Sequence, residues 1–166
     1  AGLWEYRGRV NIHTFSSAMC WAAVNGLRRV AKRLGLEEER QRWTEAAESL
    51  RAEILERAWN AERNCFVASL DGEGLDASLL LLPEIGIVSA TDPRFLGTLE
   101  AVERGLMHDG LVYRYDTADD FGLPETAFLV CTLWYVDALA AGGQRDKARQ
   151  VFERVLAMRN HVGLLS

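Results

Sequence analysis

The sequence has few of the residues that hold together disulfide-rich or metal-stabilised domains. Three cysteines occur among 166 residues, and no Cys-x-x-Cys pair or mixed Cys and His spacing typical of a zinc site is present. This sparse, odd set of thiols makes the reducing cytoplasm the expected location. A chain of this length buries about two-thirds of its unfolded surface, so its core needs neither a disulfide nor a metal. We expect no metal site.

Long hydrophobic runs and a surplus of positive charge are missing too. The longest apolar run, 127–136, is much shorter than the ~20 residues that span a bilayer. The first residues show neither the basic cap nor the apolar stretch of a signal peptide. Lys and Arg number 19 against 24 Asp and Glu, a net charge of −5. This balance, with basic residues spread along helices, disfavours nucleic acid and anionic membranes as partners.

What the chain has in quantity is apolar residues at helical spacing. Apolar residues make up 49% of the chain and recur at steps of three and four, which predicts amphipathic helices. Cys20, Leu27 and Leu34 share the apolar face of the first helix, and Phe152 is expected to point inward from the last. The six predicted helices cover roughly 16–34, 37–58, 76–82, 93–106, 124–141 and 144–159.

The predicted helices alternate in character. The third and fifth are apolar on almost every side, whereas the second, fourth and sixth have one apolar and one polar face. A helix that is apolar all round must be enclosed by protein, and a striped helix can face water. The pattern predicts an all-α fold of three α/α hairpins with inner and outer helices, part of a toroid. Short extended pieces are expected at 66–70 and 111–115.

Three loops that precede the inner helices would emerge at the same end of such a toroid. They are 3–7, 71–76 and 113–122, and each mixes carboxylates with aromatic residues, glycine or arginine. Hydrolysis of a glycosidic bond needs one carboxyl group to protonate the leaving oxygen and another to activate water. Charged groups also form strong hydrogen bonds to hydroxyl-rich ligands. A tryptophan beside the acid excludes water and raises its pKa.

Each of these residues also has an ordinary structural interpretation. Glu5 fits a solvated carboxylate near a terminus, Trp4 a packing residue and Arg114 a structural ion-pair partner. Asp119 and Asp120 fit a turn or a helix entry before Phe-Gly. Composition and periodicity alone therefore predict a helical domain and leave its chemistry open.

Motifs along the chain resemble glycoside hydrolase family 15, the glucoamylase and trehalase-type enzymes. The resemblance implies an (α/α)6 barrel, of which three hairpins form about half, and inverting hydrolysis of α-glucosidic bonds by two glutamates. The similar stretches, in the family's order, are GLWEYRG (2–8), HTFSSAMCWAA (13–23), LDASLLLLPEIG (75–86), DPRF (92–95), VYRY (112–115), DDFGLPETAF (119–128), CTLWYVDALA (131–140) and RNHVGLLS (159–166).

The same resemblance assigns roles to particular residues. Glu5 in GLWE is expected to be the general acid. In the family the general base is the glutamate that follows Gly-Leu-Leu-Ser, so residues 1–166 are expected to be a partial catalytic domain that stops just before it and is inactive alone. No cofactor is implied. The expected substrate-binding residues are Trp4, Tyr6, Arg114, Asp119 and Asp120.

The expected substrate is an oligosaccharide or disaccharide glucoside, with starch oligosaccharide, dextran-type glucoside and trehalose all open. Half a toroid would leave inner helices uncovered on one flank, so self-association through this open face is expected. Two other functions stay open beside the hydrolase. One is a non-catalytic carbohydrate-binding module, and the other is a structural α/α interaction domain.

Overall fold

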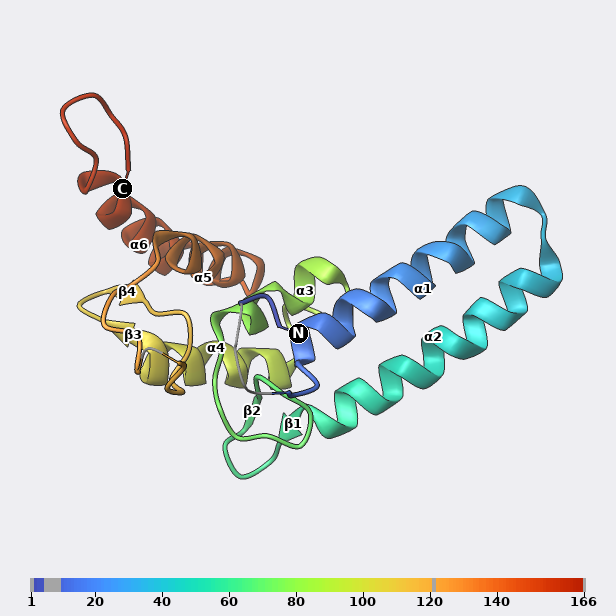
Figure 1. Cartoon of the computed structure of the whole chain (residues 1–166). Helices are drawn as coiled ribbons and strands as arrows, with labels where there is room; N and C mark the ends of the chain where they lie inside the picture. Colours follow the sequence, from blue (N-terminus) through green and yellow to red (C-terminus); the bar gives the residue numbers. More distant parts are fainter. Residues whose placement is uncertain (1, 5–9, 121, 166) are drawn as a thin grey trace.

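The computed structural model describes residues 2–4, 10–120 and 122–165. In this part of the chain α1 packs along α2 and α5 packs along α6, each as a helical hairpin, and two short β-hairpins lie between these pairs (Figure 1). In chain order the elements are α1 (Thr14–Leu34), α2 (Glu37–Arg57), β1 (Trp59–Asn60), β2 (Cys65–Phe66), the 3-10 helix η1 (Ala77–Leu81), α3 (Leu82–Ile85), α4 (Pro93–Leu106), β3 (Met107–His108), β4 (Leu111–Val112), α5 (Leu129–Ala141) and α6 (Arg145–Ala157).

Helices α1 and α2 form a long hairpin that projects away from the other elements (Figure 1). Gly35 ends α1 at a φ of 70°, a left-handed conformation that glycine adopts without strain. Because the outer part of the hairpin has little packed against it, the apolar face predicted along α1 is largely exposed. Cys20 is exposed, and Leu27 and Leu34 expose 45% and 67% of their surface.

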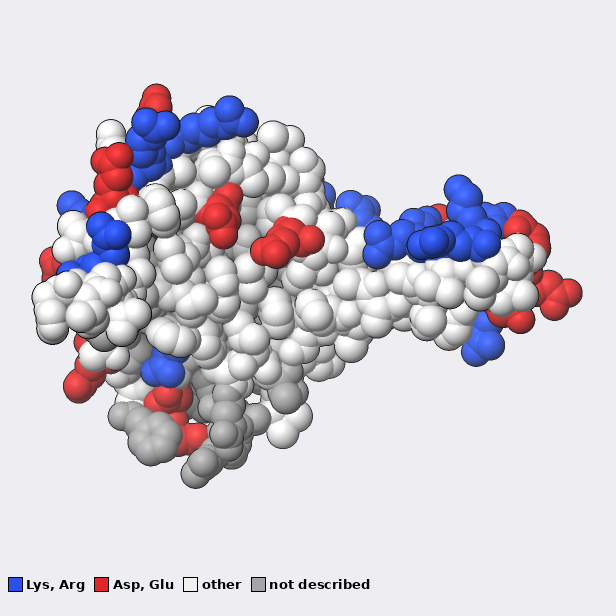
Figure 2. All heavy atoms as spheres, turned by 90° about the horizontal axis from the view of Figure 1, so that it is seen from above, with Lys and Arg blue, Asp and Glu red and all other residues white. Residues whose placement is uncertain are grey.

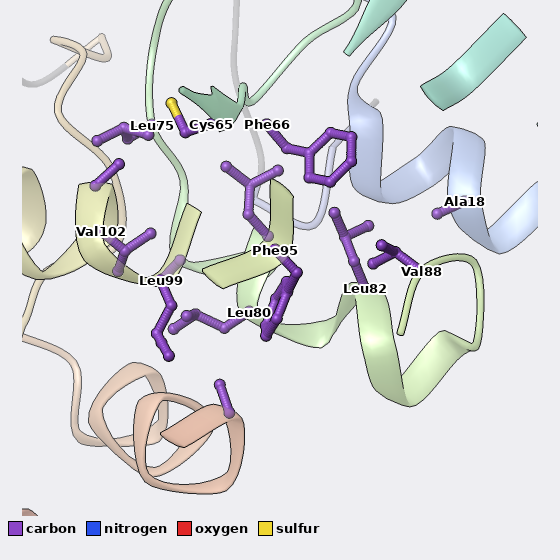
Figure 3. Packing of buried hydrophobic residues seen from close by; sticks show 14 of the residues in the cluster. Ala18, Cys65, Phe66, Leu75, Leu80, Leu82, Val88, Phe95, Leu99 and Val102 are labelled. Atoms are coloured by element: carbon purple, nitrogen blue, oxygen red, sulfur yellow. The ribbon is translucent and has the colours of Figure 1, made fainter. Parts of the chain in front are cut away.

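The core lies where η1, α3 and α4 meet the first β-hairpin. In Figure 3, Phe95 of α4 lies beside Leu80 and Leu82, and Phe66 lies nearby on β2. Helix α4 begins as predicted: the Asp92 side chain accepts a hydrogen bond from the backbone N–H of Arg94 at 2.9 Å, and proline occupies the first turn.

The prediction of an α-helix at 76–82 is wrong in the type of helix. The segment is a 3-10 helix followed by the single turn α3, and Pro83, expected to halt the helix, lies in the first turn of α3. The backbone N–H of Ala77 donates to the carbonyl oxygen of Arg114 at 2.8 Å, which fixes the entry of the segment. Proline has no N–H for an α-helical hydrogen bond, so an α-helix cannot run through this point undisturbed.

The fifth predicted helix starts too early. Residues 124–128 are not helical, and α5 begins at Leu129. The N–H of Phe128 donates to the carbonyl oxygen of Val112 at 3.3 Å, and the hydroxyl of Tyr113 donates to that of Glu125 at 3.1 Å. These contacts hold 124–128 in the loop region. In α6, Phe152 is 42% exposed, so its predicted inward position is also wrong.

Each β-hairpin is hydrogen-bonded to a later helix through a threonine side chain. The backbone N–H of Phe66 in β2 donates to Thr98 of α4 at 2.8 Å, and that of Val112 in β4 donates to Thr132 of α5 at 2.9 Å. Both threonines are fully buried. The strands lie in the predicted extended pieces 66–70 and 111–115 or at their edges but are shorter, Cys65–Phe66 and Leu111–Val112. No helix in the described part of the chain is both long and apolar enough to span a bilayer.

Candidate functional site

The described parts of the three loops expected at one rim meet around Asp76. Asp76 forms an isolated antiparallel bridge with Tyr115, next to the hydrogen bond from Ala77 to Arg114. From the N-terminal segment, the indole N–H of Trp4 donates to Oδ1 of Asp76 at 3.1 Å. Trp4 and Asp76, which are 72 residues apart along the chain, therefore share one small region with Arg114 and Tyr115.

A hollow of about 600 Å³ opens beside this junction. Its wall combines an indole ring, a guanidinium group and three carboxylates, which is the mixture that a polyhydroxylated ligand needs: one flat apolar face and several directed hydrogen-bonding groups. The residues that line it are Leu3, Trp4, Arg114, Tyr115, Asp119, Asp120, Leu123, Pro124, Glu125 and Thr126.

Trp4 both packs and lines the hollow. Its ring lies 6.4 Å from that of Tyr115, 6.0 Å from that of Phe128 and 6.1 Å from that of Trp134, measured between centroids. These tilted arrangements are favourable for aromatic pairs. The packing interpretation and the binding interpretation of Trp4 are therefore both compatible with its place.

Arg114 lies against two aromatic rings. Its guanidinium carbon is 5.9 Å from the centroid of the Trp4 ring and 5.3 Å from that of Tyr115. Cation–π attraction of this kind orients a guanidinium group while leaving its N–H donors available for other partners. Arg114 is thereby held at the wall of the hollow.

Asp119 and Tyr115 form a hydrogen-bonded pair. The Tyr115 hydroxyl donates to Oδ2 of Asp119 at 2.5 Å. Burial and this bond raise the pKa of Tyr115 to about 12, so the hydroxyl stays protonated at neutral pH. Asp119 also belongs to a tight turn closed by reciprocal backbone hydrogen bonds with Gly122, and Asp120 is exposed at the edge of the hollow. The turn predicted as the alternative is present, and both carboxylates still line the hollow.

The structure brings together Trp4, Arg114, Asp119 and Asp120. Glu5 and Tyr6 lie outside the described residues, so the acid role of Glu5 and the binding role of Tyr6 stay predictions. In the described part of the chain, no group of three or more His, Cys, Asp or Glu side chains could hold a metal ion.

Sequence reasoning missed residues that shape the hollow. Asp76 precedes an apolar run, a pattern that usually signals only a helix cap. Tyr115 lies in the expected loop but was not singled out, and Phe128 belonged to a segment predicted to be helical. The available signal was the density of aromatic residues in VYRY and ETAF beside acidic ones.

The family model described as "Glycosyl hydrolases family 15" matches residues 1–163. A trehalase of Thermoplasma volcanium is 36% identical over 167 residues, which cover 100% of this chain and 27% of that protein. A glycosidase variant solved in complex with glucose superposes with a TM-score of 0.78 at 20% identity, over 93% of this chain and 41% of that one. A bacterial glucoamylase complexed with acarbose gives 0.72 at 18% identity, over 93% and 28%.

These solved neighbours are glucoamylase-like (α/α)6 proteins, so the predicted fold class is confirmed: helical hairpins forming about half of an (α/α)6 toroid, with minor β segments between them. The chain spans 27% of the length of the Thermoplasma trehalase, so it corresponds to one part of a larger relative. With a family model matching residues 1–163, the chain belongs to the glycosyl hydrolases of family 15.

Proposed function

We propose that this chain is part of an inverting hydrolase of α-glucosidic bonds. It forms one glucose-binding wall of the active site and supplies the general acid. The observation that supports the proposal is the meeting of Trp4, Arg114, Asp119 and Asp120 around one hollow in a family 15 chain. The similar proteins, a trehalase, a glycosidase complexed with glucose and a glucoamylase complexed with acarbose, favour a glucoside as substrate.

In this proposal each side chain that lines the hollow makes a different contact with the sugar. The indole of Trp4 offers an apolar face to a sugar ring, and Arg114 donates hydrogen bonds to hydroxyl oxygens. Asp119 and Asp120 accept hydrogen bonds from sugar hydroxyls, with Asp119 oriented by Tyr115. Glu5, the residue after Trp4, protonates the glycosidic oxygen.

The proposed chemistry also needs a second carboxylate. In an inverting glycosidase the two carboxyl groups lie roughly 6.5–9.5 Å apart, with a water molecule between the base and the sugar. Because the chain spans 27% of the trehalase relative, the base and the opposite wall come from the rest of a complete domain. The specificity among α-glucosides depends on that remainder as well.

The test compares the chain alone with a complete domain. The isolated chain is expected to release no measurable glucose from trehalose, maltooligosaccharides or isomaltooligosaccharides, because loss of a general base typically costs 10²–10⁴-fold and lost positioning costs more. A chimera in which this chain replaces the aligned segment of the Thermoplasma volcanium trehalase is expected to release glucose from at least one of them. An enzyme-coupled glucose assay measures both.

A pair of arginine variants in the chimera gives the control. Arg114→Ala should lower kcat/KM at least 10-fold, whereas Arg149→Ala, exposed on α6 and outside the hollow, should leave it unchanged. Glucose release by the isolated chain would contradict the need for the remainder. A folded but inactive chimera that still binds an acarbose-like inhibitor in calorimetry would favour the non-catalytic carbohydrate-binding module instead. A folded chimera that neither cleaves nor binds would favour a structural domain.

We also propose that copies of the isolated chain self-associate through an apolar surface, here called the open face. It surrounds a hollow of about 450 Å³ that is lined by six apolar residues and one carboxylate: Phe15, Met19 and Ala22 of α1, Leu81 of η1, Ile85 and the acidic Glu84 of α3, and Trp134 of α5. Figure 2 shows a broad area without Lys or Arg beside the projecting hairpin, interrupted by few acidic side chains. Contiguous apolar surface of this kind usually marks an interface.

A further inference from the structure

Asp76 links the loops of the candidate site through both its side chain and its backbone. We propose that Asp76 is a positioning residue that holds Trp4 in the wall of the hollow, in register with Arg114. Its effect on catalysis rests on the function proposed above, whereas its effect on Trp4 does not. The comparisons with known proteins assign no role to this position.

The burial of Asp76 is not explained by helix capping alone. Asp76 is 4% exposed, and no other Asp or Glu in the described part of the chain is buried. Asp92 caps α4 in the same way, accepting from the N–H two residues on, yet its side chain keeps 22% of its surface exposed. A carboxylate buried without full hydrogen bonding is costly. At Asp76 a partner from a distant segment, the indole of Trp4, joins the hydrogen bonds from Ser78.

The hydrogen bond to Asp76 selects one orientation of the Trp4 ring. Three aromatic rings surround it at centroid distances of 6.0–6.4 Å, and such contacts favour tilted packing without determining where the indole N–H points. The indole N–H is a single donor, and its bond to Oδ1 of Asp76 at 3.1 Å determines how the ring is turned. The same Oδ1 accepts the N–H of Ser78 at 2.8 Å, so the acceptor is itself held.

The backbone around Asp76 holds the loop that carries Arg114. The N–H of Ala77 donates to the carbonyl oxygen of Arg114 at 2.8 Å, and the N–H of Leu75 donates to Oδ1 of Asp116 at 2.8 Å. Residues 75–77 therefore contact both the side chain of Trp4 and the loop that carries Arg114. This common reference explains how an arginine on one loop and a tryptophan on another line the same hollow.

The segment before Trp4 is also closely packed. A Cβ atom at Gly2 would lie 3.0 Å from Nδ1 of His13, so residues 2–4 have little room to shift at this end. His13 precedes α1 and lies close enough to Asp76 for the carboxylate to raise its pKa, although burial of the imidazole has the larger, lowering effect. With Gly2 against His13 and Trp4 on Asp76, the segment that leads into Glu5 is fixed at two points.

The first experiment measures Trp4 directly in the 166-residue chain. The indole N–H resonance of Trp4 is identified by its loss in Trp4→Phe. In Asp76→Ala this resonance should shift and its hydrogen exchange should accelerate at least 10-fold, because the acceptor is gone. Asp76→Asn keeps an oxygen acceptor and should preserve the protection, and Asp92→Ala removes the matched cap on α4 and should leave Trp4 unchanged. An unchanged Trp4 resonance and exchange rate in Asp76→Ala overturns the proposal.

The second experiment measures catalysis in the active chimera. Asp76→Ala should lower kcat/KM by 10- to 100-fold, mostly through kcat, because a small displacement of a catalytic segment is that costly. Asp76→Asn should recover most of the loss, and Asp92→Ala should lose none of it. Trp4→Phe keeps an aromatic ring and removes the donor, so Asp76→Ala should add little to it in a double variant.

The outcomes separate this inference from the proposed function. If the parent chimera is inactive, the proposed function fails and the Trp4 resonance alone decides whether Asp76 holds the indole. In an active chimera, equal losses of kcat/KM in Asp76→Ala and Asp92→Ala would show that the positioning role is wrong. So would a double variant in which the losses of Asp76→Ala and Trp4→Phe add fully. If Asp76→Ala does not fold, Asp76→Asn and Trp4→Phe carry the same test: full protection of Trp4 in the first and a 10-fold loss of kcat/KM in the second support the role, and failure of either overturns it.

Discussion

Asp76 shows how one buried side chain can serve several parts of a fold. Burial raises its pKa above the ordinary value of 3.8, and hydrogen bonds from Ser78 and Trp4 lower it by less. The ionised form is therefore less favourable in the folded chain than in the unfolded one. The connection of three loops at one carboxylate thus has a cost in stability at neutral pH.

This cost predicts how stability depends on pH. Since the folded pKa of Asp76 is raised, its contribution to the free energy of unfolding is fully present below the unfolded pKa and is lost as pH rises toward the folded value. The groups that interact electrostatically with Asp76 do not reverse this sign. A charged His13 favours the carboxylate only at lower pH, and Tyr115 and Cys131, whose pKa values are raised to about 12, stay neutral in this range. Asp76→Asn cannot ionise, so its melting temperature relative to wild type should rise between pH 4 and pH 7.

Asp92 provides a control of opposite sign. Its hydrogen bonds from Arg94 hold the pKa of Asp92 below the ordinary value, so its stabilising contribution is present above the unfolded pKa and lost as pH falls. Asp92→Asn should therefore be less stable than wild type at pH 7, and the deficit should shrink at pH 4. Thermal unfolding followed by circular dichroism measures both variants. Parallel pH trends for the two would contradict the assignment.

Two glycines in helices differ in what surrounds them. On α4, a Cβ at Gly97 would lie 2.3 Å from the carbonyl oxygen and 2.7 Å from Nδ2 of Asn64, in the turn between β1 and β2. On α1, a Cβ at Gly26 would meet nothing within 4 Å. Helix α4 approaches the first hairpin closely enough that only glycine fits at the contact.

The glycine pair predicts opposite changes in stability. Gly97→Ala should lower the free energy of unfolding by about 1–3 kcal/mol, because backbone must move to admit the methyl group. Gly26→Ala should raise it by about 0.5–1 kcal/mol, because alanine loses less conformational entropy in a helix. Urea denaturation of the two variants beside wild type measures this. Stabilisation by both would show that α4 and the hairpin can separate without cost.

The observed bounds match the predicted ones for helices that begin or end at a local sequence signal. They differ for helices whose form depends on contacts with distant segments. Helices α1, α2 and α4 begin or end within about two residues of the predicted positions, marked by Gly35, the acidic run 37–39 and the Asp92–Pro93 pair. The start of α5 and the form of η1 depend instead on hydrogen bonds to the loop at 112–114. No periodicity within a segment contains that information.

The molecule as a whole is an incomplete ring of helices with the open face on one side. Beyond that face, α1 carries further exposed apolar residues, Val30 at 51% and Leu34 at 67%. In a complete (α/α)6 domain, neighbouring helices would cover such surfaces. In the isolated chain, a second copy could bury this exposed apolar surface.

Self-association should therefore depend on α1. The mass of the chain in sedimentation or light scattering should rise with concentration above that of the monomer, 18.6 kDa. Met19→Glu and Val30→Glu place charges on exposed apolar positions and should shift the chain toward monomer, because burying a charge in an apolar contact is unfavourable. Val10→Glu, at a position 98% exposed outside α1, is the matched control and should change nothing. A wild-type monomer at high concentration would refute the proposal.

The sequence by itself determined the helical class, the bounds of α1, α2 and α4 to within about two residues, and the family, because periodicity, caps and motifs are properties of neighbouring residues. It also placed Trp4, Arg114, Asp119 and Asp120 in candidate loops. Only the tertiary structure decided that these side chains line one hollow, that 124–126 belongs to its wall and that Asp76 connects its loops. The physical reason is that burial and hydrogen bonding between distant segments depend on which surfaces meet, and that is decided when the whole chain packs.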